Sequence, residues 1–217
     1  MTQETDHPTT IAGPPLTVLP TPRTTLREVP FGEVRAILAG EPAADRWAWA
    51  PGYPFDGTVG GAKLVLRMVT ADAYRPGFGL YQIVDRVSGL AVGDVGFHSA
   101  PDAEGTAEIG YGLIEPFRGR GLATEAVEAL LGWTFRQPGV TTVRAETDED
   151  HLPSRRVLEK TGFTLLGTDG ETREYARRRE PTLPMRPKAG RPSSGTCHCH
   201  ESHPAVTVVG SVTNGTV

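Results

Sequence analysis

The sequence predicts an α/β (α+β) domain built on one open mixed sheet with helices on its faces. Residues 106–113 alternate between apolar side chains and small or acidic ones, which is the period of a β-strand. From Leu122 to Thr134 the apolar residues recur at helical spacing. A strand at 140–147 follows the break at Pro138-Gly139, so a strand–helix–strand crossover with a locally parallel strand pair is expected.

The N-terminal part should supply one strand and two helices. Residues 1–20 are rich in Thr and Pro without any period, which is typical of a disordered leader. A first strand is expected at 21–29. The remaining expectations are a helix opened by Pro30 and ended by Gly40, a loop at 46–56, and a helix marked by Val59, Ala62, Leu66 and Val69 with Thr58 as its N-cap.

The other strands come in hairpins, and together they make a sheet of six to seven strands. Turn residues separate each pair of apolar runs, which is the signal of antiparallel pairing. The expected elements are strands at 79–87 and 90–98 joined at Ser88-Gly89, a turn at 101–105, a helix at 154–161 ended by Gly162, and a hairpin of 163–168 and 171–178 around Asp169-Gly170.

Composition places one domain at 21–180 and a disordered tail at 181–217. The tail carries Cys197-His198-Cys199-His200 and His203, but ligands one residue apart are too tightly spaced for a typical zinc site, so no metal is predicted. A net charge of −4 argues against nucleic-acid binding. The chain shows neither a signal peptide nor an apolar run of the roughly 18 residues that a membrane span needs, so a cytoplasmic protein is expected. The oligomeric state stays open, a homodimer included.

The loop Arg118-Gly119-Arg120-Gly121 has the composition of an anion site. The first turn of the following helix leaves backbone N–H groups unpaired, and the helix dipole favours a negative charge there. Glycines let the backbone approach a bulky anion, and the two arginines add positive charge. The chain lacks the Lys-Ser/Thr of a P-loop and the third glycine of a dinucleotide fingerprint, so another phosphate ligand is indicated.

Two motifs resemble those of the GNAT N-acetyltransferases. The hexapeptide from Arg118 to Ala123 fits Gln/Arg-x-x-Gly-x-Gly/Ala, the coenzyme A pyrophosphate loop of that family. Residues 149–163 resemble a second family motif, of which the chain keeps Ser154, Leu158, Lys160, Gly162 and Phe163. The opening strand and Glu108-Ile109-Gly110-Tyr111 are similar to the ribosomal-protein N-acetyltransferase branch. The resemblance covers roughly residues 20–180.

The resemblance implies acetyl-CoA as co-substrate and a splay between the fourth and fifth strands, 106–113 and 140–147. Pantetheine would extend the fourth strand through the backbone of Leu113 and Ile114. His151 stands where the family has an Asn that touches the coenzyme. The pyrophosphate would be held by Arg118, Gly119, Arg120, Gly121, Leu122, Ala123 and Thr124.

Two residues are candidates for proton transfer. Only a neutral amine attacks a thioester, so a base must remove a proton first. Glu108 on the central strand is the candidate base. The alternative role for Glu108 is a paired or solvated carboxylate at a strand edge. The resemblance offers Ser154 as proton donor to sulfur, its alternative being a helix-start serine that caps backbone donors. Leu158 replaces the tyrosine that many members use as general acid. His98, at a strand end, is expected to be structural.

Trp49 and Tyr53 are the candidate substrate-binding residues, because aromatic side chains favour recognition loops. Packing of that loop onto the sheet is the alternative. The function that follows is transfer of an acetyl group from acetyl-CoA to a primary amine by direct attack in a ternary complex. The amine could belong to a protein N-terminus or to a small molecule. A non-catalytic coenzyme A-binding or regulatory module is the alternative.

Overall fold

The computed structural model describes residues 16–41 and 48–180, which belong to one compact unit that ends at Glu180. Most of the predicted leader and the whole predicted tail, including the Cys/His cluster, lie outside the described residues. Among the described helices, none has the length and apolar character needed to cross a membrane.

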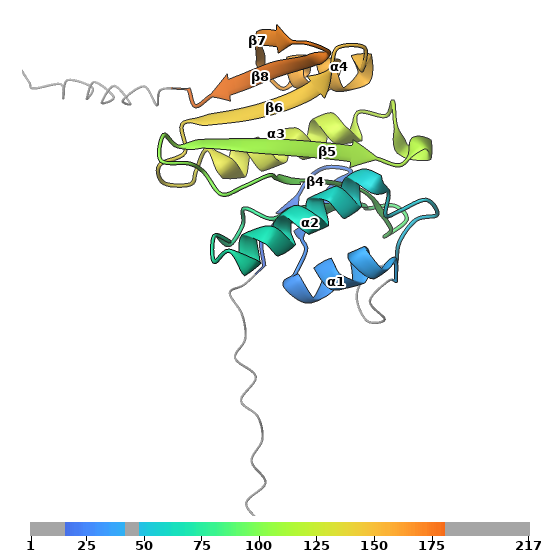
Figure 1. The fold of residues 1–217 in the computed structure, drawn as a ribbon. Coiled ribbons are helices and arrows are strands. Elements are labelled where there is room, and N and C mark those ends of the chain that lie inside the picture. Colours follow the sequence, from blue (N-terminus) through green and yellow to red (C-terminus); the bar gives the residue numbers. More distant parts are fainter. Residues whose placement is uncertain (1–15, 42–47, 181–217) are drawn as a thin grey trace, which may run out of the picture. The chain divides into compact units, whose positions relative to one another are not determined.

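One sheet of eight strands forms the centre of the fold, in the order β1-β2-β3-β4-β5-β6-β8-β7 (Figure 1). Every neighbouring pair is antiparallel except β5 and β6, which confirms the mixed sheet and the predicted parallel crossover. The strands are β1 (Val18–Pro20), β2 (Thr24–Glu28), β3 (Leu80–Asp85), β4 (Ala91–Phe97), β5 (Thr106–Leu113), β6 (Thr142–Asp148), β7 (Thr164–Asp169) and β8 (Thr172–Arg178).

The strand count is eight rather than six to seven because β1 lies inside the predicted leader. Leu19 pairs with Leu26 of β2, so this short segment adds an edge strand. A Thr/Pro-rich stretch carries little signal of its own, and the neighbouring strand supplies the hydrogen bonds that order it. The folded part therefore begins before residue 21.

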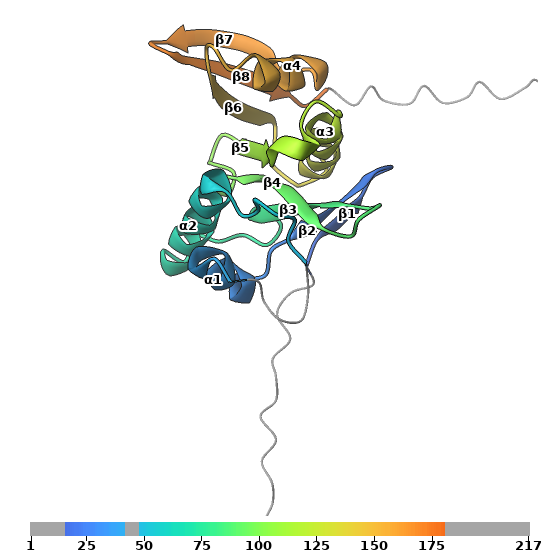
Figure 2. The same cartoon turned by 90° about the vertical axis from the view of Figure 1, so that its right-hand side faces the viewer.

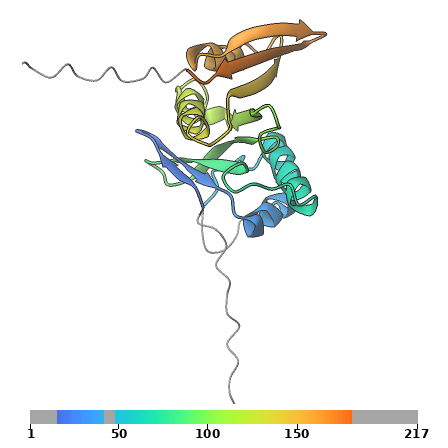
Figure 3. The same ribbon diagram turned by 90° about the vertical axis from the view of Figure 1, so that its left-hand side faces the viewer.

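Four α-helices cover the sheet, with α1 and α2 on one face and α3 and α4 on the other (Figures 2 and 3). They are α1 (Phe31–Ala39), α2 (Asp56–Thr70), α3 (Leu122–Thr134) and α4 (Leu152–Lys160), with a short 3-10 turn, η1 (Glu115–Phe117), before α3. Gly40 ends α1 with a φ of 70°, as predicted. Thr58 is not the N-cap of α2. Phe55 takes that position, and the Thr58 hydroxyl donates to Asp94 instead.

The alternation of β5 sorts its side chains between the two helical layers. Ala107, Ile109 and Leu113 are buried and belong to the same core cluster as the inward face of α3. Burial of each large apolar side chain contributes roughly 1.5–3 kcal/mol to this packing. Side chains of even-numbered β5 residues, such as Glu108, lie on the other face, toward α2. This sorting confirms the strand period predicted from the sequence.

The parallel pairing of β5 and β6 stops after three residues. Thr106 to Glu108 pair with Thr142 to Arg144, whereas β5 continues to Leu113 without further pairing to β6. Over the same length β6 stays paired with β8 as far as Asp148. The two strands therefore splay apart beyond Glu108, as the sequence resemblance implied.

Candidate active site

The backbone of β5 offers its free hydrogen-bonding groups to the splay at alternate residues. His98 N–H donates to Glu108 O at 2.9 Å, and Ile114 N–H donates to Val92 O at 3.0 Å. Antiparallel pairing alternates, so the even-numbered residues of β5 bond to β4. The backbone groups of Tyr111 and Leu113 consequently point toward the β6 side, where the splay opens.

Ile114, which the resemblance offered as a backbone partner of pantetheine, directs its N–H toward β4 instead of the splay. Its N–H is bonded to Val92, and its carbonyl accepts from Phe117 N–H at 3.0 Å. Leu113 retains its N–H on the splay side, while its carbonyl accepts from Arg118 Nε at 2.8 Å and keeps one lone pair. The backbone positions suited to a ligand in the splay are therefore Tyr111 and Leu113.

The glycine loop leads from the end of β5 into α3. Gly119 and Gly121 have φ values of 71° and 77°, a left-handed conformation that residues with a Cβ adopt at a cost. The first bond inside the helix runs from Glu125 N–H to Gly121 O at 3.1 Å. The amides of Leu122, Ala123 and Thr124 precede it and lie in the first turn, where a helix has no acceptors of its own.

The side chains of the loop add positive charge beside the amides of this helix start. Arg118 and Arg120 are exposed, and the Arg120 guanidinium lies 5.2 Å from the Phe117 ring centroid. Two guanidinium groups beside unpaired amides and a positive helix end favour an anion more than any one of these features alone. The residues present therefore fit the pyrophosphate of coenzyme A.

Ser154 and Tyr111 meet across the splay. The Tyr111 hydroxyl lies 2.8 Å from Ser154 Oγ and 3.0 Å from Ser154 O. Burial raises the pKa of Tyr111 to about 12, more than the Ser154 hydrogen bond lowers it. Ser154 is the third residue of α4 and caps nothing, since the N-cap is His151. Tyr111 was not among the predicted site residues. Leu158, which stands where the resemblance placed a tyrosine, is buried in the core.

His151 lies at the start of α4, on the β6 side of the splay. Its ring is exposed, and Nδ1 is 3.5 Å from Thr147 Oγ1. The helix start places this side chain beside the same opening as Ser154. Contact between His151 and a coenzyme stays a prediction.

Glu108 and His98 form a bonded pair on the α2 face. Glu108 Oε1 lies 2.6 Å from His98 Nδ1, and both side chains are partly exposed. The hydrogen bond from His98 lowers the pKa of Glu108 against the effect of burial, and the same bond raises the pKa of His98. The predicted base is therefore a carboxylate paired with a histidine at the strand edge, and its role in catalysis stays a prediction.

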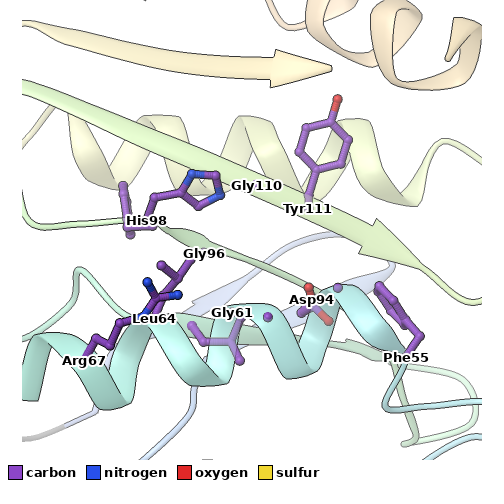
Figure 4. A pocket seen from close by; sticks show the side chains of 13 residues that line it. Phe55, Gly61, Leu64, Arg67, Asp94, Gly96, His98, Gly110 and Tyr111 are labelled. Carbon is purple, nitrogen blue, oxygen red and sulfur yellow. The ribbon is translucent and has the colours of Figure 1, made fainter. Parts of the chain in front are cut away.

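A pocket of about 390 Å³ lies between α2 and the β4–β5 ladder (Figure 4). Glycines of α2 and of the β4–β5 ladder make room for the pocket because they have no side chain, and polar side chains line part of it. The lining residues that bear on chemistry are Phe55, Arg67, Asp94, His98, Gly110 and Tyr111. The Tyr111 side chain itself points from β5 toward α4, away from α2.

The aromatic residues predicted to bind substrate do not line this pocket. Tyr53 is 6% exposed and packs edge-on against Trp49 and Phe55, at centroid distances of 5.8 and 6.2 Å. Of the three, only Phe55 reaches the pocket wall. Both rings pack against their neighbours in the loop, and contact of Trp49 or Tyr53 with a substrate stays a prediction.

Asp94 is a pocket carboxyl that the sequence analysis missed. It lies opposite Gly112 in the β4–β5 register, is 5% exposed, and accepts a hydrogen bond from Thr58. Burial raises its pKa to about 7, although the Thr58 bond acts in the opposite direction. An acidic residue in the middle of a buried strand was the available signal, since such positions are otherwise apolar.

The chain belongs to the GNAT acetyltransferase family, because the model of the acetyltransferase (GNAT) domain matches residues 23–164.

Curated relatives agree with this family. The chain is 32% identical over 99 residues to the uncharacterized N-acetyltransferase YjdG of Bacillus subtilis, covering 46% of this chain and 59% of the relative. It is 29% identical over 87 residues to the uncharacterized N-acetyltransferase p20 of Bacillus licheniformis, covering 40% of this chain and 49% of that relative. The matches thus span about half the length of these relatives.

Solved structures share the fold. An acetyltransferase from Agrobacterium tumefaciens is 26% identical with a TM-score of 0.54, covering 77% of this chain and 98% of that one. A RimL ribosomal-protein alpha-N-acetyltransferase, solved in complex with coenzyme A, is 20% identical with a TM-score of 0.55, covering 75% and 98%. At that identity the second likeness shows the fold alone.

Proposed function

We propose that this protein transfers the acetyl group of acetyl-CoA to a primary amine by direct attack in a ternary complex. The observation that carries the proposal is the opening of β5 from β6 beyond Glu108, which leads directly to the anion site at the start of α3. A thioester whose phosphates bind at that helix start would extend along β5 with its acyl group in the splay.

Three sets of groups along this path would bind different parts of the coenzyme. First-turn amides of α3 and the guanidinium groups of Arg118 and Arg120 would hold the pyrophosphate. The backbone of Tyr111 and Leu113 would bond the pantetheine amides as an added strand. His151, at the other wall of the splay, would contact the coenzyme from the α4 side.

Two bonded pairs supply the proton transfers that an amine acceptor needs. A primary amine is protonated near neutral pH and must lose a proton before it attacks. The His98–Glu108 pair lies on the α2 face of β5 and accepts that proton. The Ser154–Tyr111 pair lies on the α4 face and donates to the departing sulfur. The bond from nitrogen to the acetyl carbon forms as the carbon–sulfur bond breaks.

The pocket between α2 and the β4–β5 ladder is the proposed acceptor site. It borders His98 and Gly110 and is separate from the pyrophosphate loop. Its lining includes the carboxyl of Asp94 and the imidazole of His98, groups that can bind or deprotonate an amine. The acceptor class is a primary amine of a protein N-terminus or of a small molecule.

The test is release of free thiol from acetyl-CoA in the presence of a panel of peptides and small amines, paired with calorimetry of coenzyme A binding. We expect saturable binding and acceptor-dependent release. Binding of coenzyme A without release for any acceptor would support a non-catalytic module instead. No detectable binding would refute both functions.

A further inference from the structure

His98 and Glu108 hold each other in one orientation through both backbone and side chain. They are directly opposite in the ladder, next to the Phe97–Ile109 pair, and His98 N–H bonds to Glu108 O at 2.9 Å. The 2.6 Å contact between Nδ1 and Oε1 adds a second tie. The backbone bond sets the two residues opposite each other and the Nδ1–Oε1 contact orients the ring, although the His98 side chain is 43% exposed.

The carboxylate dictates which ring nitrogen carries the hydrogen. An ionised Glu108 can only accept, so Nδ1 must donate, and the neutral imidazole then has its lone pair on Nε2. That nitrogen lies against the backbone of Gly110, since a Cβ placed on Gly110 would be 2.9 Å from it. Gly110 is two residues past the point where β6 leaves β5. His98 and Gly110 both line the pocket, so this ring nitrogen lies at the pocket wall (Figure 4).

We propose that His98 Nε2 takes the proton from the acceptor amine and that Glu108 is a positioning residue that fixes the imidazole tautomer. This inference rests on the proposed acetyl transfer and names the group that starts it. Nε2 removes one proton from the ammonium group and later releases it to water. The freed nitrogen bonds to the acetyl carbon and the carbon–sulfur bond breaks. Sulfur gains a proton from the Ser154–Tyr111 pair, nitrogen loses its second proton to water, and water returns a proton to the pair.

The charges around His98 support a proton acceptor near neutral pH. The hydrogen bond to Glu108 is the largest influence and raises the pKa of His98, with a smaller contribution from Glu146 and an opposing one from burial. Arg144 of β6 acts on Glu108 and lowers its pKa. From α2 and β4, Arg67 and Asp94 line the same pocket. A base is most effective when its pKa lies near the working pH, which favours the imidazole over the Glu108 carboxylate.

The inference predicts distinct pH profiles for variants of the two residues. Wild-type kcat/KM should rise with pH through the His98 pKa. His98→Gln should lower it by a factor of about 10² to 10³ at pH 7 and remove this limb. Glu108→Gln should shift the limb to lower pH and cost about 10-fold, because imidazole remains as base. Glu104→Gln, at an exposed turn position, is the charge-matched control and should match wild type.

Chemical rescue separates a proton acceptor from a residue that only shapes the pocket. Added imidazole should restore part of the turnover of His98→Ala but none of that of Glu108→Ala. The inference is overturned if Glu108→Gln abolishes the rising limb while His98→Gln keeps it. It is equally overturned if imidazole rescues nothing although His98→Ala is folded by circular dichroism.

Nuclear magnetic resonance tests the pair without any acceptor. The chain has six histidines, and the His98 ring signals are those missing from His98→Gln. We expect the Nδ1–H tautomer and a pKa above the ordinary value of 6.5, lowered in Glu108→Gln. An Nε2–H tautomer or an unchanged pKa would overturn the pairing even if acetyl transfer is confirmed. A failed thiol-release assay with the expected spectra would instead refute only the proposed function.

Discussion

Arg23 and Glu125 form an ion pair of 2.8 Å between Nε and Oε2, although they lie 102 residues apart in the chain. Arg23 follows β1, and Glu125 is in the first turn of α3. Arg23 Nη1 also donates to Arg120 O at 2.7 Å. The pair therefore fixes the glycine loop from the side of the first two strands.

Glu125 should stabilise the fold only above acidic pH. Burial raises its pKa, but hydrogen bonds from Thr21 and Arg23 outweigh burial and lower the pKa to about 2. A lowered carboxylate pKa gives stability that is present above the unfolded value of 4.5 and lost as pH falls toward 2. Because Arg23 is half exposed, we expect Glu125→Gln to cost about 1–2 kcal/mol at pH 7. Urea unfolding at pH 7 and pH 2.5 measures this, and an equal loss at both pH values would contradict it.

Arg23 should matter for the coenzyme and not for the chemistry. Without the contacts of Arg23 to Arg120 and Glu125, the glycine loop would be held less firmly. The negative charge of Glu125 would then have no paired arginine and would repel the phosphates of a bound coenzyme. Arg23→Met should raise the KM for acetyl-CoA by about 3- to 10-fold with little change in kcat, which corresponds to roughly 1 kcal/mol of binding. Arg35→Met, on α1, is the matched control. A lower kcat at unchanged KM would show that the loop contact is not what Arg23 provides.

Local patterns predicted most of the fold because each element carries its own signal. The period of β5, the helical spacing of α3 and the glycine that ends α1 are each visible within a short stretch of sequence. The strand β1 has no such signal, since it is ordered by pairing with β2. Thr58 looked like a helix cap in sequence, but its partner Asp94 comes from another layer of the fold.

The sequence analysis missed part of the site because it did not work out the register between neighbouring strands. The turn centred on residue 103 places His98 opposite Glu108, so the pair could have been found by folding the predicted hairpin about that point. The same register decides that the Ile114 amide bonds to β4 and leaves Tyr111 and Leu113 facing the splay. The contact of Tyr111 with Ser154 joins residues 43 apart and depends on how α4 packs, which no local pattern specifies.

Gly121 should be needed for coenzyme binding beyond its effect on stability. Its φ of 77° is costly for alanine, and a Cβ would also come 3.3 Å from Arg23 Nη2. Gly121→Ala should lose roughly 1–2 kcal/mol of stability and raise the KM for acetyl-CoA. Gly170→Ala is the control, with a φ of 61° in the β7–β8 turn and no neighbour near its Cβ. Equal KM values in the two variants would contradict a role for the loop conformation.

The Ser154–Tyr111 pair should act as one proton donor. Two hydroxyls bonded at 2.8 Å share the work of protonating sulfur, so removing either should cost much of what removing both costs. Ser154→Ala and Tyr111→Phe should each lower kcat about 10- to 100-fold. The loss of kcat in the double variant should be far smaller than the product of the two single losses. With the pKa of Tyr111 at about 12, no loss of rate from its ionisation is expected below pH 10.

The control for this pair is Tyr74→Phe, whose hydroxyl bonds to Glu28 away from the splay. It should leave kcat unchanged while lowering stability. Multiplicative losses in the Ser154/Tyr111 double variant would mean that the two hydroxyls act in separate steps.

Asp94 should destabilise the folded protein near neutral pH. Its pKa is raised from 3.8 to about 7 by burial, so the folded state holds a proton that the unfolded state releases between these values. Stability therefore falls as pH rises from about 4 to 7. Asp94→Asn keeps an acceptor for Thr58 and removes this penalty, so it should stabilise the protein at pH 8 by up to about 4 kcal/mol.

The gain should disappear below pH 4, where the wild-type carboxyl is protonated in both states, and thermal unfolding at pH 3.5 and pH 8 measures the difference.

A carboxyl kept in a pocket at such a cost is expected to serve the acceptor. Asp94→Asn should therefore raise the KM for the amine while leaving that for acetyl-CoA unchanged, because the pocket between α2 and β4 is separate from the pyrophosphate loop. Destabilisation at pH 8 would show that the charged carboxylate is satisfied by its surroundings and that Asp94 is structural.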